Sequence, residues 1–282
     1  LERDLGKGHR ATCVPDEFVE GSEAFFCVDA GGGENASSLL VRVGTDGSYE
    51  ETSLEGINWR AAVNEDRVIV VGGNEGKVLA FDRSLSKLWQ SQAIGASGFY
   101  GIDLAAARSL LRSGSGWHLV DGRGELLASA DMESVYEGGE ENCDARLTES
   151  GKLFVATEDA SCVENPADVK WWGAGQNLGG TTLFSIAGTD FVFVSNKNSK
   201  KAQLLRFPES EVGALEVVFD AEDSQRLIAV IDGDIPALVL EREKTLSTVQ
   251  LSDGTELATW PADFNRYPVL LDGNGLILAE QK

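Results

Sequence analysis

The 282-residue sequence has one methionine, two histidines and six prolines, and it is short of positive charge, with 24 basic against 46 acidic residues. It also lacks any apolar run near the roughly 18 residues that a membrane-spanning helix needs, so we predict no transmembrane segment. The formal net charge of -22 argues against nucleic acid as a partner, because two polyanions repel each other. The same charge favours a protein partner with a basic surface, and a high-salt habitat is the alternative explanation.

The scarcity of histidine restricts the chemistry that the chain can perform. His9 and His118 are the only histidines, and neither forms a recognisable metal-binding pair with a second histidine or a cysteine. A His-dependent catalytic triad is disfavoured for the same reason, and no G-x-S-x-G hydrolase motif occurs. We therefore predict no catalytic residue and no cofactor, and the sequence favours a protein that is not an enzyme.

The four cysteines occur as two local pairs, Cys13 with Cys27 and Cys143 with Cys162. Each pair would close a short loop, as disulfides in oxidising compartments often do, and no C-x-x-C spacing points to zinc or thioredoxin chemistry. We predict two disulfides, with four unpaired buried thiols as the alternative. The chain begins at Leu1 and not at Met, which is consistent with a processed, extracytoplasmic protein, periplasmic or secreted, with a lipid tether upstream of Leu1 as a further option.

Composition and turn residues predict an all-β protein. There are 32 glycines, and Val, Phe, Trp and Thr recur in short runs that Gly, Asp and Asn interrupt. Turn-forming aspartates lie between alternating strands at Asp46, Asp82, Asp121 and Asp253, at intervals of 36, 39 and 132 residues. The last interval is three times 44, and the turn formers Asn165-Pro166 and Pro208 lie near its internal marks.

A second hairpin lies between successive turns, so each unit of about 40 residues holds four strands, as in a β-propeller blade. These hairpins are WRAAVNEDRVIVVGG, YGIDLAAARSLLRSG, ARLTESGKLFVATED, LFSIAGTDFVFVSN and RLIAVIDGDIPALVL. We predict one propeller domain over residues 1–282 with seven blades. The last blade would combine the hairpin of Tyr267 to Lys282 with one in Leu1 to Val14 that turns at Gly6-Lys7-Gly8, because shared strands close the ring. Six blades with an irregular N-terminal extension are the alternative.

Three segments, GKVLAFDRSLSKLWQ, GWHLVDGRGELLAS and VQLSDGTELATW, resemble the repeat of the PQQ-like, or quinoprotein-like, β-propellers. In that family a strand ending in Asp leads through a Gly-containing turn to a strand whose Trp packs between blades. The resemblance assigns this place to Trp89 and Trp260, with Ala128 near it in the third blade and Trp171 or Trp172 in the fourth.

The family includes quinone-dependent dehydrogenases and cofactor-free members such as the lipoprotein subunit of the bacterial outer-membrane barrel-assembly machine. Its enzymes carry a disulfide between adjacent cysteines and a calcium-binding cluster of carboxylates and amides. This chain has no adjacent cysteines and is short, so it resembles the cofactor-free, scaffold-like branch.

Two groups of residues are candidate sites. Glu140, Glu141, Asp144 and Asp159 form the densest set of oxygen ligands and could bind calcium, although the D-x-[DN]-x-[DN]-G pattern is missing and a solvated acidic face is the simpler explanation. Trp171 and Trp172 would point to opposite faces of a strand, so one of them is a candidate partner-binding anchor, as is one of Phe99 and Tyr100. Burial of all these rings between blades is the alternative.

The predicted function is a non-enzymatic scaffold that mediates protein–protein interaction in an envelope or extracellular complex, with loops that recognise the partner. The alternative is a carbohydrate-active or small-ligand-binding propeller that uses carboxylates in its central channel. Asp103, Asp144 and Asp232 are the carboxylates that the strand pattern places best for that role.

Overall fold

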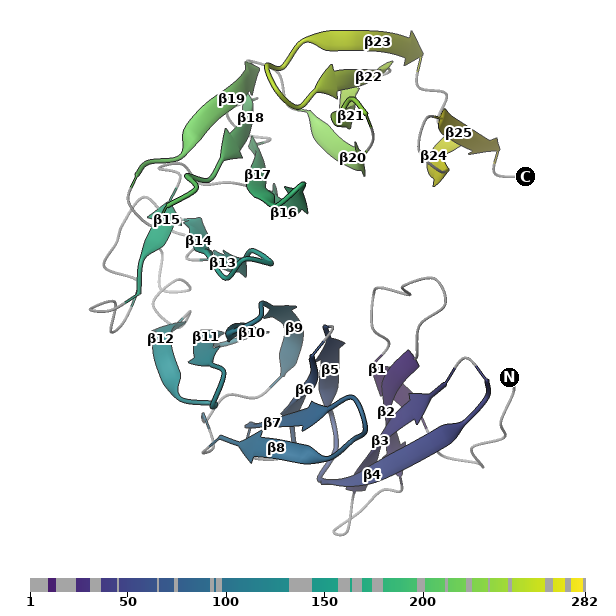
Figure 1. Ribbon diagram of the computed structural model, residues 1–282, viewed down its shortest axis with the longest axis vertical. Helices are drawn as coiled ribbons and strands as arrows, with labels where there is room; N and C mark the ends of the chain where they lie inside the picture. The colour runs from purple at the N-terminus through teal and green to yellow at the C-terminus, as the bar shows by residue number, and fades with distance from the viewer. Residues whose placement is uncertain are drawn as a thin grey trace. The chain divides into compact units, whose positions relative to one another are not determined.

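A computed structural model describes much of the chain and shows only β-structure there. The described residues are 10–13, 24–30, 37–44, 46–64, 66–73, 76–91, 94, 98–131, 144–156, 163, 169–173, 180–196, 201–210, 213–221, 225–232, 234–242, 245–261, 266–271 and 275–280. They form 25 strands in seven sheets and contain no helix (Figure 1). The chain divides into two compact units. The single domain over residues 1–282 stays a prediction.

Unit 1 comprises Leu1–Val155 and Asp159–Trp171 and holds sheets 1 to 3 and most of sheet 4. Sheet 1 consists of β1 (Arg10–Cys13), β2 (Ala24–Ala30), β3 (Ser37–Val43) and β4 (Tyr49–Glu55). Sheet 2 consists of β5 (Arg60–Val63), β6 (Arg67–Gly72), β7 (Lys77–Asp82) and β8 (Lys87–Gln90). Sheet 3 consists of β9 (Phe99–Leu104), β10 (Arg108–Ser113), β11 (Gly116–Asp121) and β12 (Leu126–Asp131). Sheet 4 consists of β13 (Asp144–Leu147), β14 (Leu153–Ala156) and β15 (Trp171–Gly173).

Unit 2 comprises Ala156–Glu158 and Trp172–Lys282, so the boundary between the units crosses sheet 4. Sheet 5 consists of β16 (Gly180–Ile186), β17 (Thr189–Asn196), β18 (Lys201–Arg206) and β19 (Glu216–Ala221). Sheet 6 consists of β20 (Arg226–Ile231), β21 (Ala237–Arg242), β22 (Thr245–Gln250) and β23 (Glu256–Pro261). Sheet 7 is the pair β24 (Arg266–Leu271) and β25 (Gly275–Glu280).

The strands of each sheet follow one another in chain order, which confirms the predicted all-β propeller fold. All five hairpins predicted between the turns form, each from the first two strands of a sheet, from β5–β6 to β20–β21, and the C-terminal hairpin forms as β24–β25. The turns at Asp46, Asp82, Asp121 and Asp253 each join the third strand of a sheet to the fourth, as does the segment with Pro208. Asn165-Pro166 lies outside the described residues. The number of blades stays a prediction.

The N-terminal strand differs from the prediction for the last blade. Arg10 and Ala11 of β1 pair with Asp29 and Val28 of β2, so this strand belongs to sheet 1 and not to the sheet of β24 and β25. Only ten residues separate Cys13 from Ala24, and the entropy cost of bringing two chain segments together rises with the number of residues between them, which favours pairing with the next strand. The predicted turn at Gly6-Lys7-Gly8 lies outside the described residues.

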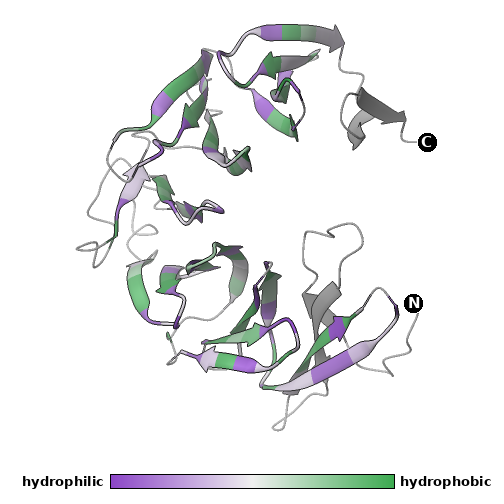
Figure 2. Cartoon of the chain, in the orientation of Figure 1, coloured by the Kyte–Doolittle hydropathy of each residue, from purple (hydrophilic) through white to green (hydrophobic). Residues whose placement is uncertain are grey.

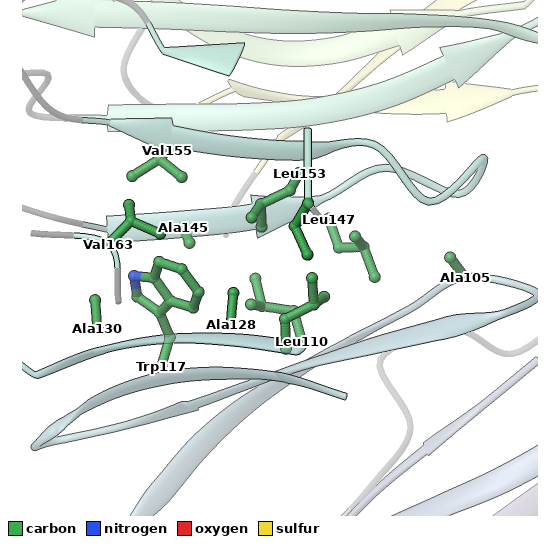
Figure 3. Close-up of a cluster of buried hydrophobic side chains, with 12 residues drawn as sticks. Ala105, Leu110, Trp117, Ala128, Ala130, Ala145, Leu147, Leu153, Val155 and Val163 are labelled. Carbon is green, nitrogen blue, oxygen red and sulfur yellow. The ribbon is translucent and has the colours of Figure 1, made fainter. Parts of the chain in front are cut away.

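The core of each unit lies between successive sheets. Every residue of β6 is buried, because the neighbouring sheets of the stack cover both faces of this sheet. Figure 2 shows apolar residues along β6 and β7, whereas β4 is largely hydrophilic. In Figure 3 the ring of Trp117 points from sheet 3 toward Ala145 and Val163. A separate buried cluster joins sheets 5 and 6, with Phe193, Leu204 and Leu240 among its members.

Candidate interaction site

In four sheets the pairing of the third strand with the fourth shifts register by one residue at the same point, and this shift identifies equivalent positions. The residue pairs next to the shift are Ala80 with Trp89, Leu119 with Ala128, Leu204 with Phe219, and Thr248 with Ala258. Trp89 and Ala128 therefore occupy the predicted position, and Phe219 occupies it in sheet 5, which the sequence did not indicate.

Trp260 and the tryptophan pair differ from the prediction that the PQQ-like resemblance made. Trp260 pairs with Leu246, two residues beyond the equivalent Ala258, because Asp253 lies three residues past the end of β22 while the turn of sheet 6 is only one residue longer than that of sheet 2. Asp253 lies in this turn, past the end of β22, so its spacing to Trp260 did not report the register. Trp171 and Trp172 lie in β15, the third strand of sheet 4, and not in a fourth strand.

The aromatic residue at this position packs on a turn glycine of the next sheet. A Cβ added to Gly124, whose φ is 85°, would lie 2.6 Å from Cε3 of Trp89, so only glycine leaves room for the ring. In unit 2 a Cβ on Gly254 would lie 3.1 Å from Cδ2 of Phe219. The same contact thus joins sheet 2 to sheet 3 and sheet 5 to sheet 6.

Arg67 connects sheet 2 to sheet 3 from the first position of β6. Its Nη2 donates to the carbonyl oxygen of Ala105 at 3.0 Å and to that of Arg108 at 3.3 Å, both at the turn between β9 and β10. The side chain is 6% exposed, and this burial lowers the pKa of the Arg67 guanidinium from its ordinary value. We call Arg67 with these two carbonyl groups the arginine bridge. Arg108, at the first position of β10, makes a related contact to the carbonyl oxygen of Gly151 at 3.4 Å.

The equivalent place between sheets 5 and 6 has no arginine bridge. In sheet 2, Arg67 pairs with Asp82, the last residue of β7, and in sheet 5 the corresponding pair is Phe191 with Arg206. Phe191 therefore stands where Arg67 stands. Its ring stacks on Phe184 with centroids 5.5 Å apart and donates no hydrogen bond to the next sheet. The position that holds the long polar side chain of Arg67 in sheet 2 therefore holds a compact apolar side chain, Phe191, in sheet 5.

A hollow of about 190 Å³ opens at this place on unit 2, and we call it the junction hollow. It lies at the end of the sheets where first strands turn into second strands and third strands into fourth, since antiparallel neighbours bring these turns to one end. Its apolar lining comes from the turn regions of both sheets, and its polar lining comes from Thr189, Arg206, Gln250 and Ser252. The apolar residues are Ile186, Ala187, Phe191, Pro236 and Leu251.

The surroundings of the junction hollow are acidic. Asp232 and Asp234 lie in the exposed turn before Pro236, and Asp253 follows Ser252. The backbone N–H of Thr255 donates to Asp253 at 2.9 Å, and this bond, together with the Thr255 hydroxyl, lowers the pKa of the Asp253 carboxyl. Arg206 is paired with Glu216, with Nε 3.1 Å from the carboxylate oxygen. Ile235, beside the lining residue Pro236, is 57% exposed.

Two of the four aromatic residues predicted as candidate anchors, Trp172 and Phe99, are buried. Trp172 is buried, donates from Nε1 to the carbonyl oxygen of Gly213 at 3.2 Å, and packs edge-on against Phe207. Phe99 is buried in the cluster between sheets 2 and 3. These two rings contribute to packing and present no surface to a partner. Trp171 is half-buried against the cluster of sheets 3 and 4, and for Tyr100 only the backbone in β9 is described.

The predicted channel carboxylates occupy different settings. Asp103 in β9 is held by both oxygens, since Oδ1 accepts from Nη2 of Arg112 at 2.9 Å and Oδ2 accepts from the backbone N–H of Leu147 at 3.1 Å. It therefore connects sheet 3 to sheet 4. Asp232 lies in the exposed turn after β20, and for Asp144 only the backbone position at the start of β13 is described.

The predicted disulfide and calcium residues are only partly described. Cys13 in β1 is the register partner of Cys27 in β2. The other predicted residues lie outside the described part of the chain: His9, Glu140, Glu141, Cys143, Asp159 and Cys162. His118 is half-buried in β11, opposite Leu111 and Ser129. Within the described ranges no three His, Cys, Asp or Glu side chains gather closely enough to hold a metal ion, and no helix could cross a membrane.

Comparison with known proteins gives likeness in fold only. No protein-family profile matches the chain, and no curated protein matches its sequence. Among solved structures, HIRA(644-1017) is 13% identical with a TM-score of 0.41, over 77% of this chain and 56% of that one. Kluyveromyces lactis Hsv2 is 9% identical with a TM-score of 0.44, over 90% and 63% of the two chains.

AztD from Citrobacter koseri is 7% identical with a TM-score of 0.46, over 90% of this chain and 86% of that one. The chain spans less than two thirds of the length of the HIRA and Hsv2 structures. The assignment of the fold to the β-propellers rests on the succession of sheets within this chain.

Proposed function

We propose that the chain is a non-enzymatic β-propeller scaffold that binds a protein partner through the junction hollow. The observation that carries the proposal is the contrast between two equivalent junctions. The arginine bridge fills the junction of sheets 2 and 3, whereas the junction of sheets 5 and 6 holds an open apolar hollow beside the exposed Ile235. A fixed apolar hollow beside an exposed apolar side chain is the kind of surface that an anchoring side chain of a partner can cover. Turn regions at one end of a rigid sheet stack are also where propellers recognise partners.

The proposal includes an extracytoplasmic location and a disulfide between Cys13 and Cys27. Opposite residues of an antiparallel pair have Cα atoms roughly 4.5 or 5.5 Å apart, and both values fall within the roughly 4.4–6.8 Å that disulfides span. The register partnership of Cys13 and Cys27 supports this bond. Peptide mass mapping of unreduced, alkylated protein is expected to find the two peptides linked. Recovery of both cysteines singly alkylated would reject the bond.

Membership of the cofactor-free PQQ-like branch is also part of the proposal. The packing of Trp89 on Gly124 of the next sheet supports it, because the Trp of that family's repeat packs between blades. Phe219 on Gly254 is the same contact with a different ring.

The function is tested by capture from the native host with a matched pair of variants. Ser252→Trp places a large ring at the junction hollow from an exposed position, and Ser86→Trp makes the same change at an exposed position in the turn between the third and fourth strands of sheet 2. We expect the wild type and Ser86→Trp to retain one stoichiometric partner that Ser252→Trp loses, and the purified pair to reassemble. Equal retention by Ser252→Trp would reject the junction hollow as the binding site.

A further inference from the structure

The junction hollow has the size of a single side chain. Its volume of about 190 Å³ is below the roughly 300–1,000 Å³ of pockets that enclose a small-molecule ligand. Ile186, Phe191 and Leu251 are each only 5% exposed, so they form a fixed apolar floor. An aliphatic or aromatic side chain inserted from a partner would cover this floor, which matches the anchor-in-pocket arrangement of protein interfaces.

The charges around the junction hollow are complementary to a basic segment. Asp232 and Asp234 are exposed in the turn that contributes Pro236 to the lining, and the lowered pKa of Asp253 keeps that carboxylate charged in the turn that contributes Ser252. The one cation in the lining, Arg206, is balanced by Glu216. A net charge of -22 on the whole chain would also accelerate the approach of a cationic partner.

We infer that the partner inserts one apolar side chain into the junction hollow and places Lys or Arg residues on both sides of it, against Asp232, Asp234 and Asp253. This inference rests on the proposed function and specifies the chemistry of its partner. Ile235 extends the apolar contact beyond the hollow, because its side chain is exposed beside Pro236. The acidic groups select the sequence around the anchor and increase the association rate, and the anchor supplies the contact area.

Three fluorescein-labelled peptides test this chemistry by fluorescence anisotropy against the full chain. The first has a central Leu between pairs of Arg, the second has Gly in place of the Leu, and the third has Glu in place of every Arg. We expect the first peptide to bind at least tenfold more tightly than the other two, and its binding to weaken as NaCl rises from about 50 to 300 mM, within the range where screening acts on exposed charges.

Three variants test whether the peptide binds at the junction hollow. Ser252→Trp is expected to abolish binding of the first peptide, and Asp234→Asn to weaken it by about threefold to tenfold. Glu149→Gln, at an exposed turn of sheet 4 in unit 1, is the matched control and is expected to bind as the wild type does. Unchanged binding to Ser252→Trp would overturn the inference.

Two other results would also overturn it: equal binding of the Gly peptide, which would mean charge without an anchor, or equal binding of the Glu peptide. If no peptide binds while Ser252→Trp still loses the native partner, the partner chemistry is wrong and the proposed function stands. If Ser252→Trp keeps the native partner, the proposed function itself fails.

Discussion

The junction of sheets 2 and 3 and the junction of sheets 5 and 6 solve the same packing problem in different ways. Both use an aromatic ring of the fourth strand on a turn glycine of the next sheet. In the first, Arg67 fills the space beside this contact and donates to two carbonyl groups. In the second, Phe191 leaves the space open. The repeated sheet fixes the backbone, and one residue at an equivalent position separates a junction closed by an arginine from the open junction that we propose as the binding site.

The largest effect is expected from Phe191→Ala, which removes the floor of the junction hollow. Phe191 is 5% exposed, and deletion of a buried ring costs about 3–5 kcal/mol of unfolding free energy. Urea denaturation followed by tryptophan fluorescence measures this loss. A loss below about 1 kcal/mol would mean that the ring is not part of a packed core.

The next effect is expected from Arg67→Met, which opens the closed junction. The carbonyl oxygen of Ala105 would lose the Arg67 donor, and that of Arg108 would keep the backbone N–H of Ala105 at 3.0 Å, so the free energy of unfolding is expected to fall by about 3 kcal/mol. Arg123→Met is the control, because Arg123 is exposed on a turn of sheet 3. Equal stability of the two variants would show that the arginine bridge contributes nothing.

A smaller effect is expected from Gly124→Ala, which tests the contact that both junctions share. The added methyl group meets Trp89 and is also placed at a positive φ, so we expect a loss of about 2 kcal/mol. Gly188→Ala has a similar φ of 75° with no atom within 4 Å of the added Cβ, so it isolates the backbone strain of about 1 kcal/mol. If both variants lose the same free energy of unfolding, the contact between Trp89 and Gly124 is not tight.

The smallest effect is expected on the pH dependence of stability. Hydrogen bonds from the Ser84 hydroxyl and the Ser86 backbone N–H lower the pKa of Asp82, so its folded-state pKa is below the unfolded value near 3.8. The stabilisation is complete above that value and is lost as the pH falls through the folded pKa. We expect Asp82→Asn to narrow the difference in urea midpoint between pH 6 and pH 3. Ser84→Ala should narrow it less, and an unchanged difference in both variants would contradict this assignment.

The sequence was sufficient to predict the repeated hairpins but not the register in which the third and fourth strands pair. Strand alternation and turn residues predicted the hairpins, because both signals are local to a few neighbouring residues. The sequence did not indicate Phe219 because no aspartate turn precedes it, and it misplaced Trp260 because Asp253 lies inside the turn and not at the end of a strand as Asp82 does. The junction hollow depends on Phe191 standing where Arg67 stands, and that equivalence exists only once strands are paired.

Hydrogen exchange measured by mass spectrometry, with and without the purified native partner, tests the central claim most directly. We expect the partner to slow exchange in residues 186–191, 234–237 and 250–253 and to leave residues 105–108 and 121–125, the corresponding turns of sheet 3, unchanged. Slower exchange in the sheet 3 turns with no change around Phe191 and Leu251 would contradict the claim that the open junction is the binding site.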